Sequence, residues 1–228
     1  MPAMPATNPP DDRGTASTRD KLIRAALDTF STAGFDGASA RQIERSAGVE
    51  RGLIAYHFGS KQVLWAEAVD SLFARFSAEH LGLRGALRDV SRRERARAML
   101  MAYARFNARN PEFFRILILE GHQSTERSDR LAAHLSEDLD VYRGFTGMEG
   151  PTGADDAIAI YLILGAAGAL SATSAYHRTL GLDTSGPDFV DRFARAVAAL
   201  SFGGAPGAVT TPSDLSDGQA GPVQLEAG

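Results

Sequence analysis

The stretch SARQIERSAGVERGLIAYHFGSK, residues 39–61, constrains the fold of this chain more than any other. Ser39 and Gln42 form a capping box that starts a helix. Gly48 stands where the end of that helix needs a left-handed backbone. The segment 50–58 that follows mixes apolar residues with cationic and aromatic ones. The pattern predicts two short helices joined by a tight turn.

Helical periodicity continues on both sides of this stretch, and the sequence has no period-2 strand pattern. We expect an all-α protein of about nine helices, in which an N-terminal helix-turn-helix unit of three helices precedes a larger helical domain. Outside the opening stretch the helices are expected at about 18–33, 61–80, 92–109, 111–121, 127–143, 154–179 and 187–201. In the helix of 61–80, Trp65 is expected on the side away from the buried face.

Composition divides the chain into four parts. Residues 1–16 and 203–228 are rich in Gly, Pro, Ala and small polar residues, and we expect both to be disordered. Residues 17–76 are expected to form the helix-turn-helix domain, with the reading unit at 39–58, and residues 77–202 a second domain. The chain has no cysteine, no secretion signal at 1–16 and no apolar run long enough for a membrane span, so we expect a cytoplasmic protein without disulfides.

Charge is distributed unevenly along the chain. Residues 18–64 hold seven basic and five acidic groups, a local charge of +2, whereas the whole chain carries −4 and the remainder therefore −6. This asymmetry favours a DNA-reading unit attached to an acidic body. Arg51, near the start of the second short helix, suits a guanine edge or a phosphate. Gly52 would let the backbone approach the duplex, and the alternative is a poor helix residue tolerated near an end.

Other polar residues of the same stretch are expected to hold the DNA backbone. Tyr56, His57 and Lys61 are predicted phosphate contacts, which fix register without reading sequence. Ser39 is predicted to cap its helix and contact phosphate, and Arg41 to contact phosphate or a base. The alternatives are capping alone for Ser39, a solvated charge for Arg41 and a structural hydrogen bond for His57.

Residues 17–70 resemble the N-terminal domain of the TetR family of bacterial transcriptional regulators. The resemblance rests on an apolar helix that ends in Phe30 and Gly34-Phe35, on the series Ser39, Ile43, Ala47-Gly48-Val49, and on Tyr56-His57-Phe58-Gly-Ser-Lys61. Ala55 stands where many members have an aromatic that reaches DNA, so we expect the Tyr56 ring to take more of that role. The resemblance implies a homodimer on a palindromic operator, and a C-terminal domain that binds a small molecule and releases DNA.

The C-terminal half offers candidate effector and dimer residues, each with a plain-core alternative. The residues expected to line an effector cavity are Tyr103, Phe106, Asn107, Phe114, Leu117, Tyr161 and Ser171. Small residues at 165–169 permit close helix approach, and bulky residues follow in the last helix. The expected dimer residues are Gly165, Gly168, Phe189, Phe193 and Val197, the alternative being an intramolecular core.

We therefore expect a ligand-responsive DNA-binding regulator, a repressor, whose partners are operator DNA, a small-molecule effector and a second copy of the chain. We expect no enzymatic activity, no cofactor, no membrane contact and no metal site, because Glu120/His122 and His134/Glu137 are isolated pairs without thiolates. The alternative is an all-helical small-molecule-binding protein or enzyme whose N-terminal unit makes protein contacts. DNA affinity that falls steeply with salt would separate the two.

Overall fold

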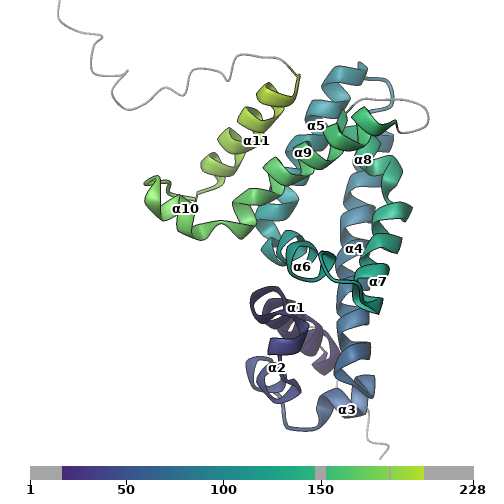
Figure 1. Ribbon diagram of the computed structural model, residues 1–228, viewed down its shortest axis with the longest axis vertical. Helices are drawn as coiled ribbons and strands as arrows, with labels where there is room; N and C mark the ends of the chain where they lie inside the picture. Colours follow the sequence, from purple (N-terminus) through teal and green to yellow (C-terminus); the bar gives the residue numbers. More distant parts are fainter. Residues whose placement is uncertain (1–16, 147–152, 185, 203–228) are drawn as a thin grey trace, which may run out of the picture. The chain divides into compact units, whose positions relative to one another are not determined.

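The computed structural model describes residues 17–146, 153–184 and 186–202. These residues form eleven helices and contain no strand, which confirms the all-α prediction (Figure 1). The terminal segments that we expect to be disordered, 1–16 and 203–228, lie outside the described residues.

Local sequence signals set the first three helices. The Ser17 hydroxyl accepts from the Asp20 amide at 3.1 Å and starts α1 (Thr18–Gly37), which is interrupted at Gly34 by a φ of 69°. The Ser39 hydroxyl accepts from the Gln42 amide at 3.2 Å and starts α2 (Ala40–Ser46), as predicted. Gly48 follows with a φ of 64°, and α3 (Leu53–Phe58) comes after the turn.

The next three helices follow the predicted pattern, with one extension. α4 (Lys61–Ala86) continues past the expected end near residue 80, through Gly82 and Gly85. α5 (Arg92–Arg109) and α6 (Pro111–Gly121) have the predicted bounds. The proline at the start of α6 suits a position where no amide donor is needed.

Two expected helices are each divided in two, so the described residues hold eleven helices where nine are expected. The stretch 127–143 contains α7 (Glu126–Glu137) and α8 (Leu139–Thr146), because the Asp138 carbonyl starts a new turn by accepting from the Val141 amide at 2.8 Å. The stretch 154–179 contains α9 (Ala154–Ala172) and α10 (Ser174–Thr179). The Thr173 hydroxyl donates to the Ala169 carbonyl at 2.6 Å, a contact that bends helices. The last helix is α11 (Pro187–Phe202).

The chain divides into two compact units, each built from two separate segments. The first contains residues 17–78 and 111–137, and the second contains residues 79–110 and the described residues from 138 to 202. The boundary between the two units lies within α4, after residue 78, close to the domain boundary predicted at residue 76. The first unit also includes α6 and α7, which the sequence analysis assigns to the second domain.

The core of the first unit forms where α1 and α6 meet the apolar side chains of α4. Phe30 of α1 is fully buried, and Phe113 of α6 packs on Phe73 and Phe76 of α4, with ring centroids 5.0 and 4.9 Å apart. Trp65 is also fully buried, so the prediction that it lies on the outer side of α4 is wrong. Buried residues at both 64–65 and 68–69 give this helix a wider apolar face than the predicted one.

The second unit is organised around α5, which contacts α8, α9 and α11. Met99, Leu100 and Tyr103 supply its buried face, and an ion pair of 2.8 Å between Arg105 and Asp191 joins α5 to α11. None of the helices described in either unit has the length and apolar character to cross a membrane.

Candidate nucleic-acid interface

α3 has two faces of opposite character. Ile54 and Phe58, one turn apart, are 3% and 6% exposed and pack into the first unit. Tyr56 points the other way and is 81% exposed, and Ala55 is also exposed. The exposed face therefore carries an aromatic ring with a polar tip, as expected from the sequence.

The turn before α3 gives Gly52 a structural role that the sequence analysis did not consider. The helix begins at Leu53, so Arg51 lies in the turn with its side chain exposed. Gly52 has a φ of 92°, a backbone conformation that residues with a Cβ rarely adopt. Backbone conformation requires this glycine, whether or not DNA comes close to it.

Glu44 of α2 provides the cap for α3, which has no side-chain cap of its own. Its carboxylate is 5% exposed and accepts from the amides of Gly52 at 2.9 Å and Ile54 at 3.0 Å. A carboxylate at the first amides of a helix satisfies donors that lack intrahelical partners. The sequence analysis did not identify Glu44 as a cap. Its carboxylate accepts from the amide of Gly52, eight positions later in the chain, and this spacing fits no local capping pattern.

Lys61 has different partners from the predicted phosphate. Its ammonium group donates to the carbonyls of Phe35 at 2.7 Å and Ala38 at 2.8 Å, and it lies 4.1 Å from the centroid of the Phe35 ring. The side chain is half-buried. This geometry assigns Lys61 to holding residues 34–38, the segment that joins α1 to α2 and runs from the break in α1 at Gly34 to the start of α2.

The remaining candidates are on or near the surface. Ser39 and Arg41 are exposed, and Ser39 caps α2 as described above. His57 is half-buried, and its ring meets that of Tyr56 edge to face with centroids 4.9 Å apart. This contact orients the two rings without using the Tyr56 hydroxyl.

Four of the seven candidate effector residues lie together in the second unit. Tyr103, Phe106, Asn107 and Ser171 are all buried, and the Ser171 hydroxyl donates to the Asn107 carbonyl at 2.9 Å. The Asn107 amide donates to the Tyr103 carbonyl at 2.9 Å. Burial raises the pKa of the Tyr103 phenol above its usual range.

A buried histidine, absent from the predicted set, joins this cluster. His80 of α4 is fully buried, and its ring centroid lies 5.7 Å from that of Phe106. The other three candidates do not join the cluster within the second unit. Tyr161 is 78% exposed, and Phe114 and Leu117 are half-buried residues of α6 in the first unit.

The dimer candidates divide between core and surface. Val197 is 5% exposed and Gly168 is buried, which favours the intramolecular-core alternative for these two. Gly165, Phe189 and Phe193 are half-buried, and the two phenylalanine rings stack with centroids 6.4 Å apart. The large apolar side chains exposed on α9 and α11 include the effector candidate Tyr161 and three that sequence analysis did not select, Ile158, Leu162 and Leu200, at 58%, 62% and 77%.

The two pairs with metal-ligand spacing have protein partners instead. Glu120 forms an ion pair with Arg127 at 2.7 Å, and His134 contacts Asp70 at 2.7 Å. Among the residues that the structure describes, no group of three or more His, Cys, Asp or Glu side chains could hold a metal ion.

These features define an all-helical protein with a helix-turn-helix unit that exposes an aromatic ring on its second helix. Residues 22–68 match the family model of bacterial regulatory proteins, tetR family. Residues 22–68 therefore match the N-terminal domain of the TetR family, and the resemblance found in the sequence is confirmed.

Curated relatives match part of the chain. The chain is 35% identical over 130 residues to the HTH-type transcriptional repressor NicS of Pseudomonas putida, a match that covers 55% of this chain and 60% of NicS. It is 32% identical over 81 residues to the HTH-type transcriptional repressor AcnR of Corynebacterium jeikeium, covering 35% of this chain and 43% of AcnR. Each match thus spans less than two thirds of the relative.

Solved structures share the fold over most of the chain. A TetR-like transcriptional regulator from Rhodococcus sp. RHA1 is 21% identical with a TM-score of 0.59, and the match covers 81% of this chain and 93% of that one. FadR from Bacillus subtilis, solved in complex with stearoyl-CoA, is 16% identical with a TM-score of 0.59, covering 81% and 98%. At these identities the likeness establishes the fold.

Proposed function

We propose that this protein is a transcriptional repressor that binds operator DNA as a homodimer and releases it when a small molecule binds. The exposed face of α3 carries the proposal, because Tyr56 is 81% exposed on a helix whose other face is anchored in the first unit. The match to the TetR-family model over residues 22–68 supports it. The proposed role is one of binding, carried out in the bacterial cytoplasm and without catalysis.

Arg51 and Tyr56 are the proposed principal contacts to DNA. Arg51 is exposed in the turn before α3, where an arginine can reach a guanine edge or a phosphate. Ser39, Arg41 and His57 are proposed as backbone contacts that fix the register. Gly52 and Lys61 support the site through the turn and the α1–α2 segment.

The proposed effector site lies in the polar cluster of the second unit. Tyr103, Asn107 and Ser171 bring neutral hydrogen-bonding groups into an otherwise apolar region around α5. Ligand sites of this kind are mostly apolar, with a few polar groups that fix orientation. An effector that binds one conformation of the dimer better than the other would change operator affinity.

The proposed dimer surface uses α9 and α11, which contact each other within the second unit. Ile158, Tyr161 and Leu162 of α9 and Leu200 of α11 are each more than half exposed. Several large apolar side chains exposed on neighbouring helices are typical of a protein–protein interface.

DNA binding is the direct test of this function. We would isolate duplexes that the wild-type protein retains from a random-sequence pool, and then measure affinity by fluorescence anisotropy as salt is raised. Affinity should fall steeply with salt, because binding releases counterions from phosphates. The double variant Arg51→Ala/Tyr56→Ala should bind about 10- to 1000-fold more weakly, since one base contact contributes about 1–3 kcal/mol.

A matched variant controls for loss of charge alone. Arg97 is an exposed arginine of α5 in the second unit, and Arg97→Ala should leave the affinity for DNA unchanged. Full binding by the Arg51/Tyr56 double variant would show that α3 is not the reading helix. A wild-type protein that retains no duplex at low salt would favour the alternative, an N-terminal unit that makes protein contacts.

A further inference from the structure

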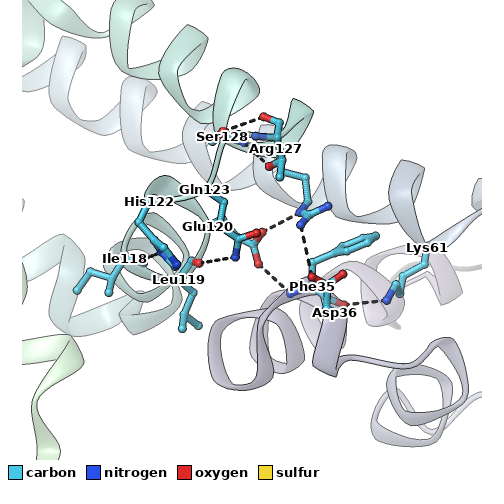
Figure 2. A network of polar contacts seen from close by, with 11 residues as sticks. Phe35, Asp36, Lys61, Ile118, Leu119, Glu120, His122, Gln123, Arg127 and Ser128 are labelled. Carbon is cyan, nitrogen blue, oxygen red and sulfur yellow. Dashed lines mark hydrogen bonds and ion pairs between the residues drawn. The ribbon is translucent and has the colours of Figure 1, made fainter.

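Glu120 of α6 places a buried carboxylate beside the segment that joins α1 to α2. The residue is 2% exposed, and its two oxygens have different partners (Figure 2). Oε1 accepts from the backbone amide of Phe35 at 2.8 Å, and Oε2 accepts from Nε of Arg127 at 2.7 Å. One carboxylate thus links α6, α7 and the end of α1, all within the first unit.

The Phe35 ring is held by the same group of residues. The Arg127 guanidinium lies 4.2 Å from the ring centroid, and Lys61 Nζ lies 4.1 Å from it. Cations at this distance from an aromatic face are attracted to it, more strongly when they are partly desolvated. Arg127 is 11% exposed, and its charge is paired with the buried carboxylate of Glu120 at 2.7 Å and with the exposed carboxylate of Asp36 at 3.9 Å.

The segment held in this way leads directly into the reading unit. Gly34 interrupts α1 with a φ of 69°, and Ser39, five residues later, is the N-cap of α2. A Cβ at position 34 would lie 3.6 Å from the Glu120 carboxylate, so α6 approaches this backbone closely. The Phe35 amide therefore depends on a residue 85 positions away in the chain.

We propose that Glu120 and Arg127 are positioning residues for DNA binding. They fix the segment 34–38, and through Ser39 they fix where α2 and α3 begin. Neither residue is within the helix-turn-helix match at 22–68, so this support comes from helices outside the DNA-binding domain. The inference rests on the proposed function, because its main readout is affinity for DNA.

Two substitutions at one position separate the contacts. Glu120→Gln keeps an oxygen that accepts from the Phe35 amide but removes the charge that balances Arg127. Glu120→Leu removes both and leaves the partly buried Phe35 amide without its acceptor, which is the more costly change. The proposal predicts that Glu120→Leu weakens DNA binding about tenfold or more and that Glu120→Gln weakens it less.

Affinity would be measured with a duplex selected by the wild-type protein, at a temperature where each variant is fully folded by circular dichroism. Hydrogen exchange of the peptide covering residues 34–38 would be followed in parallel, and should be faster in Glu120→Leu. The matched control is Asp70→Asn, which removes the charge that Asp70 presents to Arg130 and His134 between α4 and α7 of the same unit. This control should leave both the affinity and the exchange of 34–38 unchanged.

The outcomes distinguish the proposal from the function on which it rests. Wild-type affinity in Glu120→Leu, or an equal loss in Asp70→Asn, would overturn the positioning role while leaving the DNA-binding function intact. A wild-type protein that binds no duplex would overturn the proposed function itself. If Glu120→Leu does not fold, Arg127→Met provides the test. Under conditions where it is fully folded, Arg127→Met should bind DNA several-fold more weakly than the wild type, and unchanged affinity would contradict the proposal.

Discussion

Glu44 is the single side chain on which the start of α3 depends. Its buried carboxylate accepts from two amides, at Gly52 and Ile54, where the helix has no other side-chain cap. Its position on α2 means that one helix of the pair fixes the other through a charged hydrogen bond. The arrangement therefore links the geometry of the turn to that of α3.

Replacing this cap should cost stability as well as affinity for DNA. We expect Glu44→Ala to lower the free energy of unfolding by about 1–3 kcal/mol, because buried amides lose their acceptor. Urea denaturation followed by circular dichroism measures the change. Glu50→Ala is the matched control, since Glu50 is an exposed carboxylate and its removal should change stability by less than about 0.5 kcal/mol. Equal stability of the two variants would contradict the capping role.

At the scale of elements, a polar cluster joins α4 to α7 in the first unit. Arg130 and His134 both contact the Asp70 carboxylate, and the His134 ring stacks on Phe73 with centroids 4.7 Å apart. Burial alone would raise the pKa of Asp70, but the hydrogen bonds from Arg130 and His134 outweigh it and hold the pKa below its usual range. The carboxylate is therefore stabilised in its charged form when the protein is folded.

The lowered pKa of Asp70 predicts acid sensitivity with a defined sign. The stabilising contribution is present above the unfolded pKa of about 3.9 and is lost as pH falls through the lower folded value. Thermal unfolding from pH 6 to pH 3 should show Asp70→Asn less stable than the wild type at pH 6, with the difference shrinking at acid pH. The side chain is 37% exposed, so the effect should be modest. If the difference in stability between the wild type and Asp70→Asn stays constant from pH 6 to pH 3, the Asp70 carboxylate is not its source.

Helix starts and the interruption of α1 at Gly34 were predictable from the sequence, whereas the breaks at Asp138 and Thr173 were not. Ser39 and Pro111 act through neighbours within one turn, so their signals are local. The breaks at Asp138 and Thr173 depend on hydrogen bonds that compete with a helical pattern continuous in sequence. The same reason explains Glu44, whose capping role exists only once α2 and α3 are packed together.

At the scale of the molecule, the sequence indicated the helix-turn-helix segment but not the composition of the unit that contains it. α6 joins that unit through long-range contacts with α1, and α7 joins it through contacts with α6, and no sequence periodicity reveals either packing. The proposed DNA contacts were chosen by residue type within a helix-turn-helix, which does not separate Lys61, bound to the carbonyls of Phe35 and Ala38, from the exposed Tyr56. The effector and dimer candidates were chosen from apolar periodicity, which is common to core and surface sites and does not separate Val197 from Leu162.

The proposed dimer gives a prediction at this scale. Leu162→Glu places a charge on an α9 side chain that is 62% exposed, and it should convert the dimer to monomer without unfolding the chain. Sedimentation equilibrium over a range of concentrations measures the change. Ile118→Glu is the matched control, because Ile118 is 49% exposed on α6 in the first unit and should leave the association constant unaltered. Dimerisation of Leu162→Glu at wild-type strength would exclude this surface.

The position of Trp65 gives the protein an internal optical reporter. It is the only tryptophan of the chain, and it is fully buried in the first unit, so the native emission should be that of an indole shielded from water. Indole fluorescence then reports on the unit that carries the helix-turn-helix and is silent for the second unit. The tyrosines Tyr103 and Tyr142, buried in the second unit, supply a separate near-ultraviolet circular dichroism signal. Comparing the two signals during denaturation reveals whether the units unfold together or one after the other.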